Sequence, residues 1–242
     1  MPDFGIGLMC KPPRPGVSKT RLARAIGFER AAALSRAFLI DSIATLRTAA
    51  ADVPAQPYCF FKPLDAEQEI REFAGGSMKV LLQDSGDLGA TMLSALRTIL
   101  KECRRGAMLI GADVPTLPVR LIRAAFRRLQ ESNIDAVLGP SEDGGYYLVA
   151  IKNEAATPLF CGINWSTSTV MRETRGRASD FGLRIAELES WYDVDDISGL
   201  DRLVSELSKS ERIRSIGPAS ATRGVLGLGS PETSNATTLP GQ

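Results

Sequence analysis

A cationic segment directly follows the first apolar run of the chain and could bind phosphate groups. Its four cations are Lys11, Arg14, Lys19 and Arg21. Three prolines and Gly16 interrupt the segment, which predicts a stiff turn rather than a helix. A helix is expected to begin around Ser18 to Thr20, and a helix N-terminus beside Lys and Arg suits a polyphosphate. The alternative is a solvated basic turn. It is not a Walker A loop, because Ser18 stands where that motif has a Gly before its Lys.

A single carboxylate ends the apolar run Ala107–Gly111 and could hold a metal ion. Asp113 should emerge at the carboxyl end of this strand, and Pro115 prevents the strand from continuing. A carboxylate in this place can hold Mg²⁺ that is bridged to substrate phosphates. The alternative is that Asp113 caps the next helix, although Thr116 is nearer to the expected helix start.

A second acidic group lies near residue 195. On an extended segment Asp193 and Asp195 share one face, with Val194 turned the other way. Like charges this close are unfavourable unless a cation or hydrogen-bond donors lie between them. The spacing therefore favours metal binding by one of the pair. The alternative is an acidic turn in which Asp195 or Asp196 caps a following helix.

Residues 139–148 could line a substrate pocket. Asp143, Gly144 and Gly145 predict a tight reversal between two strands. The tyrosines that follow, Tyr146 in particular, would together with Asp143 also suit a substrate wall.

Two other segments leave the same choice between a structural and a binding role. Residues 162–169 combine hydroxyl groups with Trp165, and Ser166 and Thr167 could cap a helix or hold polar groups of an acceptor. Asp87 could likewise cap the helix that follows it or belong to a second loop at the site.

Short apolar runs alternate with amphipathic segments along the chain. The strands and helices that this alternation predicts would hold the candidate site residues in position. The strands expected are Phe4–Cys10, Pro57–Phe61, Lys79–Leu82, Ala107–Gly111, Ala136–Leu138 and Tyr146–Ile151. The helices expected are Glu29–Ala50, Leu88–Cys103 and Val119–Leu129. Such alternation predicts an α/β fold with a mainly parallel sheet, in which ligands bind beyond the carboxyl ends of the strands.

Composition excludes several classes of function. The 242 residues contain 29 Lys and Arg against 28 Asp and Glu, so the net charge of +1 argues against sequence-independent nucleic-acid binding. The chain has no histidine, which rules out a Ser–His–Asp triad, a Cys–His pair and a His-ligated metal site within it. Any metal must accept oxygen ligands, which favours Mg²⁺ or Mn²⁺.

Other features point to a cytoplasmic protein with one main domain. The four cysteines are far apart in the sequence and are expected to be buried thiols in a reducing compartment. No apolar run is long enough to span a membrane, and the first residues lack the pattern of a signal peptide. Residues 1–217 are expected to form the domain. Residues 218–242 are rich in Gly, Ser, Thr and Pro and predict a disordered tail.

The order of the motifs resembles the nucleotide-diphospho-sugar transferase superfamily. The motifs are KPPRPGVSKTRLA, QDSGDLGATM, GADVPTLP, LGPSEDGGYYL, GINWSTSTV and WYDVDD. They are most similar to a small bacterial family of radical-SAM/selenodomain-associated transferases, also assigned as glycosyltransferases. The resemblance runs from about Phe4 to Leu203 and implies a GT-A fold, a Rossmann-like α/β/α sandwich. It also implies a relation to the molybdenum-cofactor and phospholactate guanylyltransferases.

The resemblance implies roles for individual residues. Gly16, Lys19 and Arg21 fall where the nucleotidyltransferase relatives bind a triphosphate. Asp113 falls on the metal-binding Asp of the x-Asp-x-Pro motif, and Asp195 on the second acid at the metal. Bordering the acceptor pocket would then be Asp143, Gly144 and Tyr146. The usual Asp-Val-Asp-Thr-Pro-Glu-Asp-Leu ending reads here as Asp-Val-Asp-Asp-Ile-Ser-Gly-Leu over residues 193–200, so the residues that open the next helix differ.

The function expected is Mg²⁺-dependent nucleotidyl transfer from a nucleoside triphosphate to a phosphorylated or phosphonylated small molecule. Lys19 and Arg21 would neutralise the leaving pyrophosphate, while Asp113 and Asp195 hold the metal. This chemistry depends on positioning and charge stabilisation more than on a strong base. The alternatives are glycosyl transfer from a nucleotide-sugar donor and a non-catalytic nucleotide-binding module. Either a monomer or a homodimer is compatible with the sequence.

Overall fold

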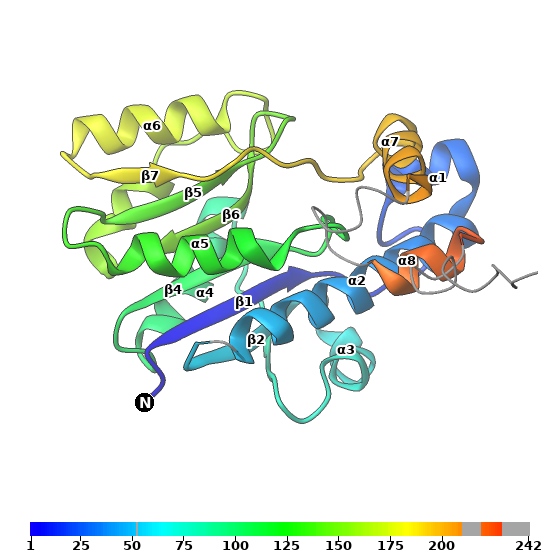
Figure 1. Ribbon diagram of the computed structural model, residues 1–242, viewed down its shortest axis with the longest axis horizontal. Helices are drawn as coiled ribbons and strands as arrows, with labels where there is room; N and C mark the ends of the chain where they lie inside the picture. The colour runs from blue at the N-terminus through cyan, green and yellow to red at the C-terminus, as the bar shows by residue number, and fades with distance from the viewer. Residues whose placement is uncertain (52, 210–218, 229–242) are drawn as a thin grey trace, which may run out of the picture.

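A mainly parallel sheet forms the centre of the protein. The computed structural model describes residues 1–51, 53–209 and 219–228, and within them the strand order is β3-β2-β1-β4-β6-β5-β7 (Figure 1). The strands are β1 (Phe4–Cys10), β2 (Ala55–Phe61), β3 (Lys79–Leu82), β4 (Gly106–Gly111), β5 (Ala136–Pro140), β6 (Tyr146–Ile151) and β7 (Ile185–Glu187). Only β6 runs antiparallel to its neighbours, β4 and β5, in this described sheet. The predicted α/β fold with a mainly parallel sheet is confirmed.

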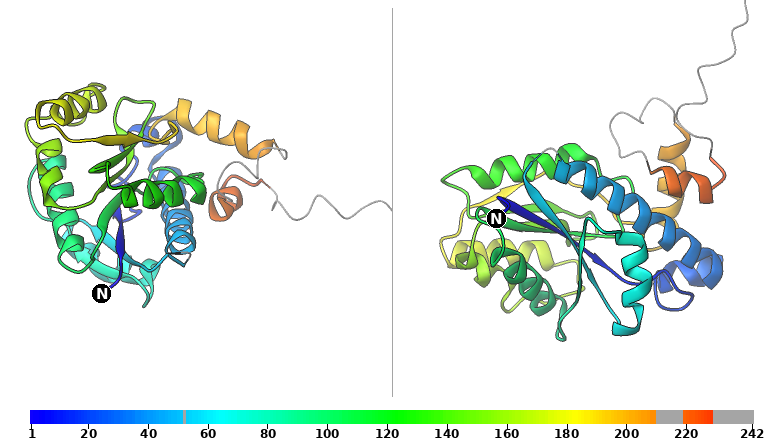
Figure 2. Two further views of the ribbon diagram at one scale, coloured as in Figure 1. Left: turned by 60° about the vertical axis from the view of Figure 1, so that its left-hand side comes forward. Right: turned by 90° about the horizontal axis from the view of Figure 1, so that it is seen from below.

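Helices cover both faces of the sheet, as the views in Figure 2 show. On one face lie α2 (Phe28–Ala51), α3 (Glu67–Ala74) and α5 (Val119–Gln130), and on the other α4 (Leu88–Leu100) and α6 (Val170–Asp180). There are also two short 3-10 helices. The first, η1 (Leu64–Ala66), lies between β2 and α3 in the sequence, and the second, η2 (Glu154–Phe160), lies between β6 and α6. Beyond the carboxyl end of β1, α1 (Thr20–Ile26) lies beside α7 (Ile197–Ser208). The result is a three-layer α/β/α sandwich.

The central strand β1 shows why the two faces pack differently. Its large apolar residues Phe4, Ile6 and Leu8 are buried in the core beneath α2 and α5. The intervening residues on the other face are Gly5, where α4 comes close, and Gly7, where side chains of the neighbouring strands β2 and β4 fill the space. A Cβ atom at Gly5 would lie 2.2 Å from Cγ2 of Ile99 in α4. Glycine at position 5 therefore permits the close approach of α4 to the sheet.

The tail prediction is wrong for residues 219–228. Ser220–Val225 form a further helix, α8, which packs beside α2 (Figure 1). Asp41 in α2 accepts hydrogen bonds from the backbone N–H groups of Ala221 and Thr222 and from the Thr222 hydroxyl, at 2.6–3.0 Å. The composition of residues 219–228 does not reveal that a buried carboxylate in α2 accepts hydrogen bonds from them. Residues 218 and 229–242 of the predicted tail lie outside the described residues.

Some local expectations also need correction. The three-residue strand β7 was not predicted, and the helix expected to reach Cys103 ends at Leu100. Three cysteines are buried as expected, but Cys161 is exposed. Among the described helices, none is long and apolar enough to cross a membrane.

Candidate functional site

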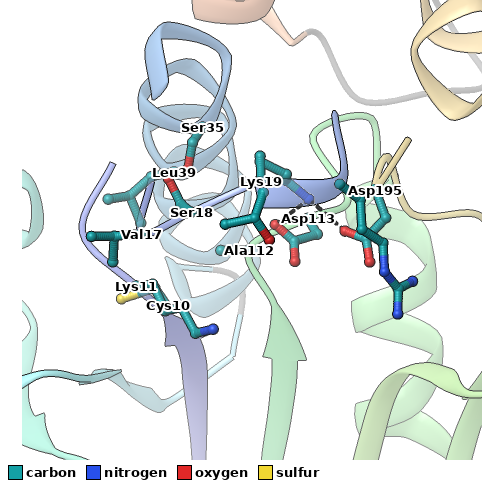
Figure 3. A pocket seen from close by; sticks show the side chains of 12 residues that line it. Cys10, Lys11, Val17, Ser18, Lys19, Ser35, Leu39, Ala112, Asp113 and Asp195 are labelled. Atoms are coloured by element: carbon teal, nitrogen blue, oxygen red, sulfur yellow. Dashed lines mark hydrogen bonds and ion pairs between the residues drawn. The ribbon is translucent and has the colours of Figure 1, made fainter. Parts of the chain in front are cut away.

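The cationic loop between β1 and α1 encloses a cavity at the carboxyl ends of β1 and β4. The cavity has a volume of about 290 Å³, and Figure 3 shows the residues that line it. Loop residues Lys11, Ser18 and Lys19 form one side, while Asp113 and Asp195 come from the segments that follow β4 and β7. The predicted phosphate loop and the two predicted metal ligands therefore meet at one place.

Lys19 lies between the two acids. Its Nζ atom is 2.6 Å from Oδ1 of Asp113 and 2.9 Å from Oδ1 of Asp195 (Figure 3). The Lys19 side chain is only 2% exposed, whereas those of Asp113 and Asp195 are 51% and 42% exposed. The Val194 N–H group donates to the Asp113 carbonyl oxygen at 3.0 Å and joins the two acidic segments. One buried ammonium group thus holds two carboxylates that remain open to the cavity.

The backbone at Lys19 adopts a conformation that a lysine seldom takes. Its φ of 51° and ψ of 40° lie in the left-handed region, and it is the residue that precedes α1. Such a conformation costs free energy and persists where the surroundings determine it. Helix α1 begins at Thr20, within the range expected from the sequence. The ion pairs account for why Lys19 is held in this conformation.

The ion pairs also keep Lys19 charged. Burial alone would lower the pKa of Lys19, but attraction to Asp113 and Asp195 and hydrogen bonds to both outweigh burial, so the pKa lies above its ordinary value. The ammonium form is therefore the form present at neutral pH.

Asp196, rather than Asp195, caps α7. Its Oδ1 atom accepts a hydrogen bond from the Gly199 N–H group at 3.0 Å. This assigns the capping role in the acidic turn and leaves Asp195 to face the cavity. The changed residues after Asp195 still open a helix, because Asp196 provides the cap.

The four cations of the loop have three different surroundings. Arg14 is turned away from the cavity toward α3, where its guanidinium group bonds to Asp65 at 2.5 Å and to Glu69 at 2.8 Å. Lys19 bridges the two aspartates. Lys11 and Arg21 line the cavity, and neither has an ion pair with a carboxylate in the described part of the chain. Of the predicted phosphate-binding residues, Lys11 and Arg21 therefore remain available to an anion. Gly16 sits at the turn with a φ of 76°.

A second, larger cavity adjoins the first. Its volume is about 510 Å³, and Arg21, Asp113 and Asp195 line both cavities. The residues predicted to bind the acceptor that also line it are Asp143, Tyr146, Trp165, Ser166 and Thr167. The fold therefore brings these predicted residues together around one space.

The turn at 141–145 is fixed tightly to the loop before α6. Gly144 has a φ of 92°, and a Cβ atom there would lie 2.1 Å from the carbonyl oxygen of Ser168. The Met171 N–H group donates to the Gly144 carbonyl at 2.8 Å, and Ser166 has a left-handed φ of 63°. The predicted reversal between β5 and β6 is confirmed, and glycine at 144 permits the close approach. Gly144, predicted to border the acceptor pocket, is not itself among the residues that line the cavity, whereas its neighbours Asp143 and Gly145 are.

Trp165 and Tyr146 form an aromatic corner in the second cavity. Their ring centroids are 6.3 Å apart at an interplanar angle of 89°. A Cβ atom at Gly89 would lie 2.3 Å from Nε1 of Trp165, so the first turn of α4 packs directly on the indole ring. Asp87 caps α4 by accepting a hydrogen bond from the Ala90 N–H group at 2.8 Å. Of the two roles considered from the sequence, a helix cap and part of a second loop at the site, the structure shows the cap.

Asp193, which the sequence analysis considered together with Asp195 as one of a pair that could bind a metal, also lines the second cavity. Its Oδ1 atom accepts a hydrogen bond from the Ser141 hydroxyl at 3.2 Å. Burial, with the nearby charges of Asp195 and Asp143, raises the pKa of Asp193. The same-face spacing with Asp195 was a signal for this position, since both side chains reach the cavity.

The residues around Lys19 suit a hard divalent cation. Asp113 and Asp195 supply partly exposed carboxylate oxygens, and Mg²⁺ is commonly held by one or two carboxylates together with water and substrate phosphates. In the described part of the chain, no group of three or more His, Cys, Asp or Glu residues is arranged to hold a metal by itself. The donor set therefore fits an ion that is bound together with a phosphate-bearing substrate.

A sequence-family comparison matches about half of the chain. A family model described as "Uncharacterized protein conserved in bacteria (DUF2064)" matches residues 45–167. A search of curated proteins finds no match.

Solved structures show the same fold. A protein from Desulfovibrio desulfuricans G20, provisionally assigned as a nucleotide-diphospho-sugar transferase, is 29% identical. Its match covers 94% of this chain and 95% of that chain, with a TM-score of 0.83. The 4-diphosphocytidyl-2C-methyl-D-erythritol synthase from Anaerococcus prevotii DSM 20548 is 8% identical over 86% and 99% of the two chains, with a TM-score of 0.58. A cytidylyltransferase from Leptospira borgpetersenii serovar Hardjo-bovis (strain JB197) is 12% identical over 86% and 87%, with a TM-score of 0.56. The predicted nucleotide-diphospho-sugar transferase fold is confirmed.

Proposed function

This chain belongs to the DUF2064 family of bacterial proteins, and we propose that it is a Mg²⁺-dependent nucleotidyltransferase. A phosphate or phosphonate oxygen of a small acceptor attacks the α-phosphorus of a nucleoside triphosphate. The new phosphorus–oxygen bond forms as the bond from the α-phosphorus to the bridging oxygen breaks. Pyrophosphate leaves with the electron pair of that bond.

The position of Lys19 carries the proposal. It lies between Asp113 and Asp195 beyond the ends of two parallel strands, where ligands bind in such sheets. Lys11 and Arg21 line the same cavity without an ion pair in the described part of the chain. Three cations around a space that also holds two carboxylates match a substrate that brings several phosphate charges together with a divalent cation.

Each residue has a separate task in this reaction. Lys11 and Arg21 bind the β- and γ-phosphates, and Lys19 offsets the negative charge that develops on the leaving pyrophosphate. Asp113 and Asp195 would hold Mg²⁺, which supplies further neutralisation of phosphate charge when it is bound. The acceptor oxygen is already ionised at neutral pH. The reaction therefore requires no histidine as general base, in agreement with a chain that has none.

Glycosyl transfer from a nucleotide-sugar donor is the second candidate function. The provisional assignment of the Desulfovibrio protein, at 29% identity over nearly the whole of both chains, favours it. The number of unpaired loop cations favours the triphosphate, since a diphosphate carries less charge for them to bind.

The two candidates release different products. Purified protein is incubated with Mg²⁺, each of the four nucleoside triphosphates and a panel of phosphate monoesters and alkylphosphonates, and pyrophosphate is measured. A parallel series contains UDP- and GDP-sugars, and free nucleoside diphosphate is measured. Acceptor-dependent pyrophosphate release supports the proposal. Release of nucleoside diphosphate alone, with no pyrophosphate in the first series, would transfer the assignment to glycosyl transfer.

Variants connect the activity to the site. Lys19→Met and Asp113→Asn should each lower turnover by about 100-fold or more, since each removes charge stabilisation at the reacting phosphates. Lys101→Met, at an exposed position at the end of α4, is the matched control and should keep full activity. Near-normal turnover in Lys19→Met would contradict the proposed roles.

A further inference from the structure

Two carboxylates in the second cavity have no cationic partner. Asp143 and Asp193 both line it, and in the described part of the chain neither lies within ion-pair distance of a lysine or arginine. Asp113 and Asp195, by contrast, share the Lys19 ammonium group. The cavity therefore holds two carboxylates that form no ion pair, although the charge of Lys19 acts on Asp193 without direct contact.

The protein positions these two carboxylates but does not satisfy them fully. Oδ1 of Asp143 accepts a hydrogen bond from the Gly145 N–H group at 2.9 Å, and Oδ1 of Asp193 accepts one from Ser141. The second oxygen of each accepts no hydrogen bond from the described residues. Each side chain is thus held at one oxygen, and the other is available to a ligand.

The opposite charge does not come from an ion pair within the described residues. Arg21, the cation that lines both cavities, is next to the phosphate site. A positive charge near Asp143 and Asp193 is therefore most simply part of the bound molecule.

The aromatic corner fits the same kind of group. Tyr146 and Trp165 stand at right angles in the cavity, and aromatic rings attract ammonium and quaternary ammonium groups. The Tyr146 hydroxyl is buried and has no hydrogen-bond partner among the described residues. The packing of Gly89 against the indole holds Trp165 in place, so the corner is preformed.

We propose that the acceptor is zwitterionic: an ammonium or quaternary ammonium group binds Asp143, Asp193 and the aromatic corner, and a phosphate or phosphonate faces Arg21 and Lys19. This inference rests on the proposed nucleotidyl transfer and defines its acceptor class, the aminoalkyl or trialkylammonium phosphates and phosphonates. A cavity of about 510 Å³ is of a size that accommodates a small molecule of this kind.

Matched pairs of acceptors test the charge directly. Binding is measured by isothermal titration calorimetry with Mg²⁺ present. Phosphocholine is compared with 3,3-dimethylbutyl phosphate, in which carbon replaces the charged nitrogen, and 2-aminoethylphosphonate with propylphosphonate. At least one ammonium compound should bind about tenfold or more tightly than its neutral partner, the order expected for a cation beside carboxylates and aromatic rings.

Three variants locate the effect. Asp143→Asn and Asp193→Asn keep the shape of each side chain and should reduce the preference for the ammonium compound to about threefold or less, with little change for its neutral partner. Asp201→Asn, at an exposed position of α7, should leave the preference intact. Thermal unfolding of each variant verifies that it is folded.

Several outcomes would overturn the proposal. Equal binding within both pairs, or no binding of any of the four compounds, would show that the cavity has no ammonium-binding site. Mn²⁺ binding that depends on Asp143 and Asp193, without an ammonium preference, would assign these acids to a second metal ion instead. If neutral acceptors support pyrophosphate release as well as charged ones, this inference fails while nucleotidyl transfer stands. If no acceptor supports release and no nucleoside triphosphate binds, the proposed function itself fails.

Discussion

Nζ of Lys19 lies 2.9 Å from Oδ1 of Asp195, although 176 positions separate the two residues in the sequence. The same ammonium group contacts Asp113. It thereby connects the cationic loop after β1 with the segments that follow β4 and β7. One lysine charge against two carboxylates leaves this group of three side chains with a net negative charge, while Lys11 and Arg21 make the charge of the whole cavity lining positive.

Replacing Lys19 with Met should make stability depend on divalent cations. The variant leaves two facing carboxylates without their cation, which should cost about 1–2 kcal/mol, less than for a fully buried pair because both acids are partly exposed. Mg²⁺ should restore more stability to the variant than it adds to the wild type. Thermal unfolding in EDTA and in Mg²⁺ measures both effects.

The pH dependence of this contribution follows from the direction of the pKa shift. The pKa of Lys19 is raised in the folded protein, so the stability from the ion pairs is complete below the ordinary lysine pKa. It is lost only as the pH rises through the raised value. The difference between wild type and Lys19→Met should therefore be constant around neutral pH. A loss that Mg²⁺ does not reduce would contradict the account of these residues.

Arg21→Ala and Arg14→Ala should have different effects despite the similar positions of the two residues in the loop. Arg21 lines both cavities, so its loss should weaken nucleotide binding by about tenfold or more. Arg14 bonds to Asp65 and Glu69 at the protein surface, so its loss should change binding by less than about threefold and have little effect on stability. Titration of a nucleoside triphosphate with Mg²⁺ compares them. Equal losses would show that Arg14 also contacts the nucleotide.

The sequence was sufficient for features that depend on local pattern. Six of the strands could be predicted from hydrophobic runs, because buried strands consist of apolar residues. The motif residues Lys19, Asp113 and Asp195 lie in contact in the structure. The direction of β6 was suggested only by the Asp143–Gly145 turn. Strand β7 has three residues, too few for a recognisable pattern.

Features that depend on distant partners could not be predicted. The partners of Arg14 lie 51 and 55 positions away, and nothing in the loop itself shows that Arg14 turns toward them. Helix α8 likewise depends on Asp41, 181 positions before Thr222. The composition of the segment after 218 indicates disorder because the residues that hold α8 belong to another part of the chain.

Gly144→Ala should damage both stability and activity. The added Cβ atom would clash with the Ser168 carbonyl, and the positive φ adds strain, so the free energy of unfolding should fall by about 2–4 kcal/mol. Gly176→Ala is the matched control, since it lies within α6 with no atom near its added Cβ. It should be neutral or stabilise by up to about 1 kcal/mol. Urea unfolding of both variants measures the difference. Similar values for the two would contradict the described packing of the turn.

Asp41→Ala should release α8 from α2. Three hydrogen bonds to this buried carboxylate are lost, which should cost about 2–3 kcal/mol. Hydrogen exchange should increase at Thr222 and its neighbours, while exchange in the central sheet is retained. Thr48→Ala, at an exposed position on the same helix, should change stability by less than about 0.5 kcal/mol. Unchanged exchange in 219–228 would show that Asp41 does not hold this helix.

The most direct test of the central claim is the thermal stabilisation of the protein by its donor nucleotide. Melting is recorded with each of the four nucleoside triphosphates and with UDP- and GDP-sugars, with and without Mg²⁺. The account predicts that one triphosphate stabilises the protein more than any nucleotide-sugar, only with Mg²⁺, and that Lys19→Met and Arg21→Ala reduce the effect. Selective stabilisation by a nucleotide-sugar, or none by any nucleotide, would contradict it.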